Sequence, residues 1–298
     1  MGIDMPSVQF LCCAKSIGVD FSDTMMIGRQ AIHTPPAEFA PLLSVVGIPS
    51  RALNTLSTGE FAEPLFGLLG AKNVRSLDVS NFEQATDIHD LNEPLPKSLS
   101  MRFSVVYDGG AIEHVFNAIQ AFKNGMEMVR VGGHFIQVNI ANNFMGHGFW
   151  QFSPELIYRV FAAENGFKIR GVFLHEVIPD GSWYKVDDPL VCRSRVELCN
   201  DKPTYICTVA QRISDVPVFS RPGQQSDYDY AWKQALSPPT PSISSAPTPA
   251  RKFSIRQLIP RKFKRVARRG IRLLVRSDPF QRTYYHRISV NDLIRGNI

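Results

Sequence analysis

Short apolar runs alternate along the first half of the chain with segments in which apolar residues recur three and four positions apart. The runs predict strands, and they lie at Thr24–Gly28, Val74–Val79, Arg102–Tyr107 and Phe135–Ile140. The segments between them predict helices at Pro35–Val46, at Glu60–Leu69 with Gly70 as its C-cap, and at Ala111–Arg130, which Gly132-Gly133 would end. Strands that alternate with helices favour βαβ units, in which helices cover both faces of a parallel sheet.

The pattern changes in the second half of the body. Ser153 is a good helix N-cap and Pro154 suits the first helical position, so we expect a helix from there to about Glu164. Two further strands are predicted at Phe167–Val177 and Pro203–Arg212. No full crossover helix separates them, so they are expected to be antiparallel. The predicted fold class is α/β, a Rossmann-like doubly wound, mostly parallel sheet with an antiparallel strand near one edge.

One composition break divides the chain. Residues 237–250 read SPPTPSISSAPTPA, with five Pro, six Ser/Thr and no charge, which is typical of an extended linker. We expect a folded body at residues 1–236 and a separate module at residues 251–298. The net charge of +6 supports this division, because residues 251–298 carry 14 Lys/Arg against two Asp/Glu, whereas residues 1–250 carry 19 against 25. A mildly acidic body is thus joined to a strongly basic tail.

The basic tail contains one amphipathic pattern. Leu258–Val275 places Phe263, Val266 and Ile271 near one helical face and basic residues on the rest. Such a helix suits an anionic membrane surface, and the same charges could bind nucleic acid or an acidic protein. A solvated tail without a partner is the third interpretation, since Gly270 weakens the helix and charge alone is unspecific. We favour the membrane surface over nucleic acid.

The five cysteines are odd in number and form no CxxC pair, which favours reduced thiols in a cytoplasmic protein. The N-terminus shows no secretory signal, and no apolar run approaches the ~18 residues of a membrane span. We therefore expect a cytoplasmic protein, held at the inner face of the membrane if the tail binds there.

Parallel sheets bind ligands at the carboxyl ends of their strands, and here those ends carry glycines and acidic residues. The first strand ends at Gly28-Arg29, the second at Asp78, a short third at the acidic turn Asp90-Leu91, and the fourth at Asp108-Gly109. Glycine permits a close approach of a ligand to the backbone. The carboxylates can accept hydrogen bonds from ribose hydroxyls and from an adenine amine. The set predicts a nucleoside site.

Four stretches in order carry a family resemblance: SLDVSNFEQATDIHDLNEPLP, RFSVVYDGGAIEHVFNAI, VRVGGHFIQVNIANN and GHGFWQFSPELIYRVFAAENGF. They resemble the class I S-adenosylmethionine-dependent methyltransferases, especially the type 11 methyltransferase domains, from about Thr24 to Arg212. The chain also resembles methyltransferase-like proteins found with bacterial polysaccharide genes.

The resemblance implies the class I methyltransferase fold and S-adenosyl-L-methionine as the cofactor. Its cofactor contacts would be Gly28, Arg29, Asp78, Asp90, Leu91, Asp108 and Gly109. The glycine-rich first motif of the family is reduced to Gly28, so Arg29 is expected either to fill the gap or to pair with the carboxylate of the cofactor.

Three residues are candidates for acid–base chemistry. His147 lies in Gly146-His147-Gly148 before several aromatic residues, so it is expected to be exposed and able to take a proton from the methyl acceptor. Glu113 and His114 closely follow the fourth strand and form a second candidate pair. The alternatives are a loop-anchoring histidine and contacts at a helix N-terminus. The histidines show no ligand spacing, so no metal site is predicted.

The predicted reaction is transfer of a methyl group to an oxygen or nitrogen of a small molecule or glycan, with the protein supplying position and a base. Two alternatives remain open. The reduced first motif favours a methyltransferase-like binding or scaffold module without catalysis. The basic tail favours a nucleic-acid methyltransferase, although no Asn/Asp-Pro-Pro-Tyr motif follows the fourth strand.

Overall fold

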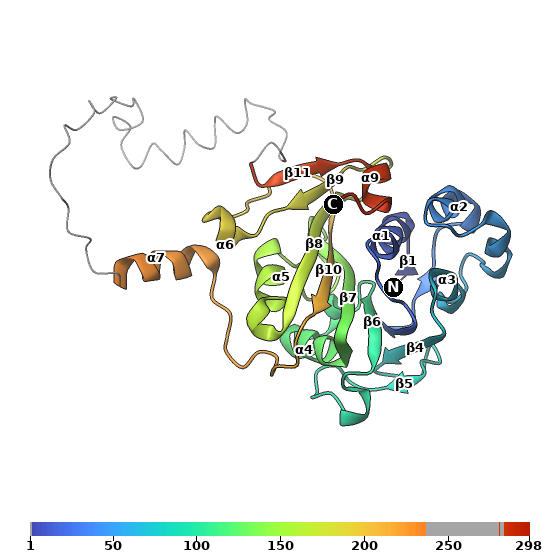
Figure 1. The fold of residues 1–298 in the computed structure, drawn as a ribbon, viewed down its shortest axis with the longest axis horizontal. Coiled ribbons are helices and arrows are strands. Elements are labelled where there is room, and N and C mark those ends of the chain that lie inside the picture. The colour runs from blue at the N-terminus through green and yellow to red at the C-terminus, as the bar shows by residue number, and fades with distance from the viewer. Residues whose placement is uncertain (1, 237–279, 281–282) are drawn as a thin grey trace.

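A computed structural model describes residues 2–236, 280 and 283–298. Its centre is a nine-stranded sheet in the order β11-β9-β8-β10-β7-β6-β2-β4-β5 (Figure 1). The parallel part consists of β2 (Asp23–Ile27), β4 (Asn73–Asp78), β5 (Asp87–Ile88), β6 (Phe103–Asp108) and β7 (Val129–Asn142). A separate parallel pair joins β1 (Gly2–Ile3) to β3 (Ala31–Ile32).

The other half of the large sheet is antiparallel. β10 (Thr204–Arg212) lies between β7 and β8 (Phe167–Glu176) and is antiparallel to both. β9 (Trp183–Val186) and β11 (Tyr285–Ile288) extend the sheet beyond β8. The return of β10 between two earlier strands confirms the predicted α/β fold class, a Rossmann-like sheet with an inserted antiparallel strand.

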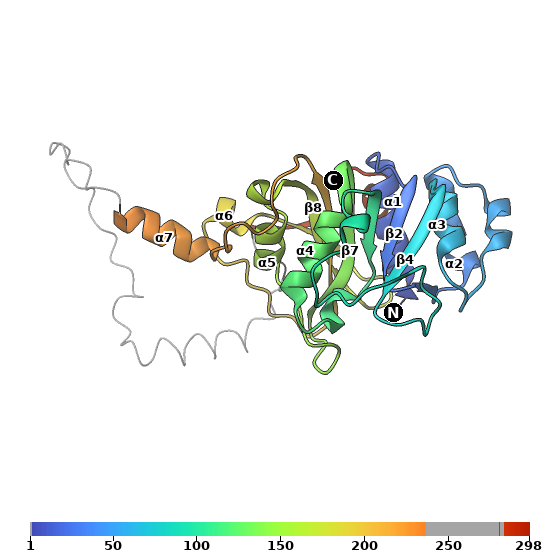
Figure 2. The same ribbon diagram turned by 90° about the horizontal axis from the view of Figure 1, so that it is seen from below.

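Helices cover both faces of the sheet because successive side chains of a strand point to opposite sides. Met25 and Ile27 of β2 pack in one core with residues of α4 (Ala118–Met128) and α5 (Pro154–Val160). Met26, between them, packs in a second core with residues of α1 (Met5–Ser16), α2 (Pro36–Val45) and α3 (Glu63–Leu69). Figures 1 and 2 show α4 and α5 on one side of the strands and α1 and α3 on the other.

Local signals set several helix ends as predicted. Gly70 follows α3 in the left-handed conformation (φ 111°), which glycine adopts without strain. The Ser153 hydroxyl caps α5 by accepting a hydrogen bond from the Leu156 amide (3.3 Å). Three 3-10 turns lie between the main elements, at Ser50–Thr55, Lys97–Leu99 and Ala163–Asn165.

The predicted helix Ala111–Arg130 needs correction. A 3-10 turn, η3 (Ile112–His114), precedes α4, which ends at Met128. Gly132-Gly133 does not end a helix but lies inside β7. A Cβ on Gly133 would be 2.8 Å from the Ser104 carbonyl oxygen, so glycine is required for the close approach of β7 to β6.

The sequence pattern does not predict α1, because residues 10–14 are apolar without a break and hide the three- and four-residue spacing of an amphipathic helix. Phe10, Leu11 and Cys12 are all buried although they follow one another directly. The helix begins at Asp4, whose carboxylate accepts a hydrogen bond from the Ser7 amide (3.0 Å). This start places the N-terminal residues near the carboxyl end of β7 and the amino end of the antiparallel β10, where they line a pocket described below.

The last residues of the chain belong to the body. β11 pairs with β9, and α9 (Val290–Ile294) packs on α1, where Leu293 is buried and the Ser16 hydroxyl donates to the Ile294 carbonyl oxygen (2.6 Å). The predicted separate module at 251–298 is therefore wrong for residues 283–298. The linker at 237–250 and the basic segment Leu258–Val275 lie outside the described residues. Among the described residues, no helix has the length and apolar character needed to cross a membrane.

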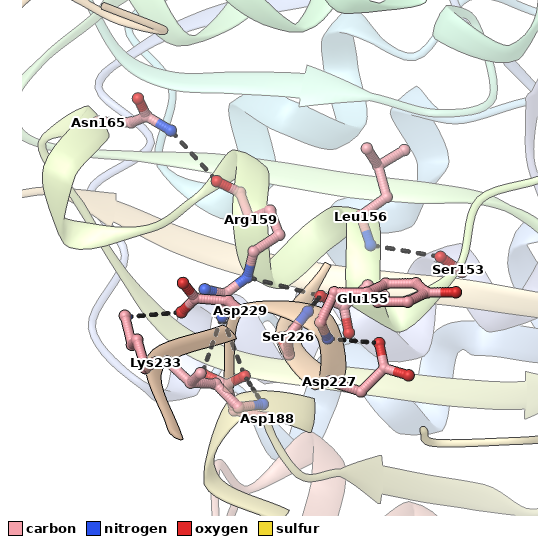
Figure 3. Close-up of polar contacts among 12 residues, drawn as sticks. Ser153, Glu155, Leu156, Arg159, Asn165, Asp188, Ser226, Asp227, Asp229 and Lys233 are labelled. Carbon is pink, nitrogen blue, oxygen red and sulfur yellow. Dashed lines mark hydrogen bonds and ion pairs between the residues drawn. The ribbon is translucent and has the colours of Figure 1, made fainter. Parts of the chain in front are cut away.

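Polar contacts attach α7 (Ser226–Leu236) to α5 and α6 (Pro189–Cys192), as Figure 3 shows. Glu155 Oε1 accepts hydrogen bonds from the amide and the hydroxyl of Ser226 (2.9 and 2.7 Å). Arg159 forms ion pairs with Glu155 (3.9 Å) and with Asp188 (3.1 Å). We call Glu155, Arg159, Asp188 and Ser226 the α5–α7 cluster, in which each charged side chain has a partner of opposite charge.

Candidate active site at the strand ends

A pocket of about 410 Å³ opens at the carboxyl ends of β6 and β7. We call it the strand-end pocket. Its lining comes from the N-terminal segment, the turn after β6, η3, β7, β10 and the loop after β7: Gly2, Asp4, Ser7, His33, Gly109, Gly110, Glu113, His114, Val138, Asn139, Ile140, Phe144, His147 and Tyr205. The pocket thus lies where an open parallel sheet binds its ligands.

Asp108 is the fully buried carboxylate beneath the pocket. Its Oδ1 accepts hydrogen bonds from the amides of Ala111 (2.8 Å) and Ile112 (3.3 Å), and its Oδ2 accepts one from Asn139 Nδ2 (2.9 Å). Burial raises the pKa of Asp108 to about 6. These three hydrogen bonds hold the turn that leads into η3, so Asp108 fixes the position of Glu113 and His114.

Glu113 is buried at the back of the pocket, with 1% of its surface exposed. Its Oε2 has no hydrogen-bond partner. Burial first and the nearby Asp108 charge second raise the pKa of Glu113 to about 8. Gly110 leaves the carboxylate its room, because a Cβ on Gly110 would be 3.0 Å from Glu113 Oε1. A buried acceptor without a donor costs free energy, so this carboxylate is suited to a ligand that donates a hydrogen bond or carries positive charge.

The loop after β7 is attached to η3 and brings His147 to Glu113. The Glu113 carbonyl oxygen accepts hydrogen bonds from the amides of Phe149 (2.8 Å) and Trp150 (3.2 Å). Gly148 permits this contact, because a Cβ there would be 2.8 Å from the same oxygen. His147 Nε2 consequently lies 4.0 Å from Glu113 Oε1. The predicted exposure of His147 is confirmed, since about half of its side chain (53%) is accessible.

His114 completes the group. Its ring centroid lies 5.1 Å from that of His147. Burial first and the His147 charge second lower the pKa of His114, which favours the neutral imidazole. We call Glu113, His114 and His147 the η3 cluster.

Two further buried acceptors close to the pocket lack donors: Asn139 Oδ1 and Gln30 Oε1. Gln30 lies against Gly109, where a Cβ would be 2.8 Å from this same oxygen. Together with Glu113 Oε2, three buried oxygens in or next to the pocket lining are without a hydrogen-bond donor. Because all three atoms are acceptors, the missing partner is a donor or a cation.

The ends of β2 and β4 differ from this open region. Arg29 donates to Glu63 Oε1 (2.7 Å) and to the Glu83 carbonyl oxygen (2.9 Å), and its guanidinium lies 3.8 Å from the centre of the Phe61 ring. These contacts hold the Arg29 guanidinium between Glu63, the Glu83 carbonyl oxygen and Phe61. Gly28 itself adopts φ 69° and donates its amide to the Leu77 carbonyl oxygen (2.8 Å).

The acidic residues predicted for a nucleoside lie outside the strand-end pocket. Asp78 is half-buried, and its Oδ1 accepts a hydrogen bond from the Ser80 amide (3.1 Å). Asp90 is exposed and uses Oδ1 for the amide and the side chain of Asn92 (2.9 and 2.7 Å), which is the geometry of a turn former. The Leu91 side chain packs in the core with α4.

The structure thus brings together four of the predicted site residues, Gly109, Glu113, His114 and His147, with Asp108 directly behind them. Sequence reasoning assigned no role to Asp4, His33, Asn139 or Tyr205. Asn139 alone had a local signal, since it lies near the end of a predicted strand. The others come from distant segments that only the fold brings to this pocket.

No family model matches the chain, and no curated protein matches it. Several solved structures match the chain. A SAM dependent methyltransferase from Aquifex aeolicus is 9% identical, with 70% of this chain and 94% of that chain covered and a TM-score of 0.35. The branched-chain polyamine synthase from Thermus thermophilus is 14% identical, with 76% and 62% covered and a TM-score of 0.37. Because these identities and scores are low, we take no function from them.

Proposed function

We propose that the protein is an S-adenosylmethionine-dependent methyltransferase whose acceptor, a small molecule or glycan, binds in the strand-end pocket. The observation that carries the proposal is the buried oxygen without a partner on Glu113, a residue that lines this pocket at the carboxyl ends of the strands. The class I methyltransferase fold supports it, since ligands of open parallel sheets bind at this edge.

The unpaired acceptors fit one half of the cofactor. S-adenosylmethionine carries a sulfonium and an ammonium group, and the donor-poor side at Glu113, Asn139 and Gln30 suits positive charge. Gly109 would allow the methionine part to pass close to the backbone. Asp78 Oδ2 would accept a hydrogen bond from a ribose hydroxyl. We assign no contact with the adenine to Asp90, whose Oδ1 binds Asn92.

When bound, the cofactor supplies an electrophilic methyl group. The protein's own residues would hold the acceptor and take its proton. His147 Nε2 is accessible from the pocket and would accept the proton from an acceptor hydroxyl or amine. Glu113 Oε1, 4.0 Å away, would stabilise the resulting imidazolium. Asp108 would keep η3 in place through its hydrogen bonds to the Ala111 and Ile112 amides.

A methyltransferase-like binding module without catalysis is the second candidate. It is favoured by Arg29, which connects the end of β2 to Glu63 and to the Glu83 carbonyl oxygen, next to Gly28. A module of this kind would keep the pocket and its ligand but would not bind the cofactor.

A calorimetric titration with S-adenosylhomocysteine separates the two candidates. We expect micromolar binding, and Asp78→Ala should weaken it by about 1–3 kcal/mol through loss of a charged acceptor. Asp90→Ala is the matched control and should leave the affinity unchanged, because Asp90 forms a turn. Absence of binding by the unchanged protein at millimolar ligand would refute the enzyme and leave the binding module.

The proposal extends to the membrane through the basic tail. The charge of residues 251–298 and the apolar residues of Leu258–Val275 support binding to an anionic surface rather than to nucleic acid. The full chain should co-sediment with anionic vesicles, and Phe263→Asp should reduce this binding while the basic residues are unchanged. Equal binding by the variant, with full competition by anionic polymers, would identify a charge tether instead.

A further inference from the structure

The η3 cluster has the composition of a metal site. The ligand atoms of Glu113, His114 and His147 all lie within 4.8 Å of one another. Two imidazoles and one carboxylate are the donors that divalent transition metals such as Zn²⁺, Mn²⁺, Fe²⁺ and Co²⁺ take in proteins. Spacing along the chain hides this set, because His147 comes from a loop far from Glu113 and His114 in the sequence.

The backbone holds the three side chains in place, as a metal site requires. The Glu113 carbonyl oxygen accepts hydrogen bonds from the Phe149 and Trp150 amides, and Trp150 Nε1 donates to the Val115 carbonyl oxygen (3.0 Å). Gly146 and Gly148, with φ of 88° and 71°, shape the loop on either side of His147. Opposite, the Asp108 carboxylate fixes the start of η3.

The distances between the ligand atoms of the η3 cluster are slightly longer than those expected around a bound metal ion. Two ligand atoms on an ion at ~2.1 Å are about 3–3.5 Å apart, and Glu113 Oε1 lies 4.0 Å from His147 Nε2. The ligand atoms, all within 4.8 Å of one another, would have to move closer on binding the ion, and the half-exposed His147 ring has the most room to do so. Glu113 Oε2, buried and without a partner, is the independent sign that something positive belongs there.

We propose that Glu113, His114 and His147 bind a divalent transition-metal ion at the wall of the strand-end pocket, with its remaining positions open to the pocket. The inference rests on the proposed function only for the ion's use, which would be to hold an acceptor oxygen and lower its pKa, in place of proton transfer to the His147 ring. The binding of the ion itself requires no methyl transfer.

The test uses the full chain, freed of metal with a chelator and then titrated with Zn²⁺ by calorimetry and with Co²⁺ by visible absorption. We expect one site, with a d–d spectrum typical of nitrogen and oxygen ligands. Mg²⁺ should bind far more weakly, since it prefers oxygen ligands. His147→Ala should weaken Zn²⁺ binding by at least about 100-fold, and Glu113→Gln should act in the same direction.

His33→Ala is the matched control, because His33 lines the same pocket but lies outside the cluster. Its Zn²⁺ affinity should equal that of the unchanged protein. Failure of Zn²⁺ and Co²⁺ to bind, or equal binding by His147→Ala, would overturn the metal site. Binding of S-adenosylhomocysteine in the presence of chelator is measured separately, so a failed metal site and a failed methyltransferase are distinguishable.

Discussion

The η3 cluster and the α5–α7 cluster contain the same kinds of side chain and differ in how they are paired. In the α5–α7 cluster, Glu155 receives two hydrogen bonds from Ser226 and Arg159 reaches two carboxylates. In the η3 cluster, Glu113 is more deeply buried, yet one of its oxygens has no partner. Carboxylates whose oxygens receive hydrogen bonds within the protein serve its structure, whereas a buried oxygen without a hydrogen-bond donor is suited to a ligand.

The largest effect on stability should come from Asp108, which lies beside the η3 cluster but is fully paired. Asp108→Ala leaves the Ala111 and Ile112 amides and Asn139 Nδ2 without their acceptor inside the protein. We expect a loss of about 2–4 kcal/mol in the free energy of unfolding, measured by urea denaturation. Asp108→Asn, which keeps an acceptor oxygen, should lose less. Equal losses would show that Asp108 does not act through these hydrogen bonds.

Replacement of Glu113 should raise the free energy of unfolding, whereas replacement of Asp108 lowers it, and the effect at Glu113 should depend on pH. Its pKa in the folded protein is raised from 4.5 to about 8, so the charged form opposes folding. Stability that is fully present below pH 4.5 is therefore lost as the pH rises through about 8. Glu113→Gln should flatten this dependence and stabilise the metal-free protein above pH 8 by about 1–4 kcal/mol. Urea denaturation in chelator from pH 5 to 9 measures it, and parallel curves for the two proteins would contradict the burial of an unpaired charge.

The smallest effects belong to the α5–α7 region and should follow exposure. Arg159→Met removes a side chain that is only 18% exposed and that pairs with Glu155 and Asp188, so about 1–2 kcal/mol of stability should be lost. Lys233→Ala breaks the exposed contact between Lys233 and Asp229 on α7 and should cost about 0.3–0.5 kcal/mol. Thermal unfolding of both variants compares them. A larger loss of stability in Lys233→Ala than in Arg159→Met would contradict the expectation that buried ion pairs contribute more to stability than exposed ones.

Much of the fold could be predicted because its signals are local. The strands at β2, β4, β6 and β7 are apolar runs, and the ends of α3 and α5 are marked by Gly70 and Ser153. Local signals failed where packing had the deciding role. Gly133 resembles a helix stop in the sequence but serves the approach of β7 to β6. In α1, residues 10–14 are all buried, and this unbroken run hides the helical spacing of its apolar residues.

For the candidate site, too, some features follow from the sequence and others only from the tertiary structure. By itself, the sequence determined that glycines and acidic residues follow the strands and that Glu113, His114 and His147 are available for chemistry. Only the tertiary structure decided that the loop around His147 is attached to the Glu113 carbonyl, that Arg29 is occupied by Glu63, and that residues 283–298 complete the sheet. The physical reason is that the sequence order alone gives the residues that follow a strand. The burial of a carboxylate and the identity of its partners depend on segments that come into contact only when the chain folds.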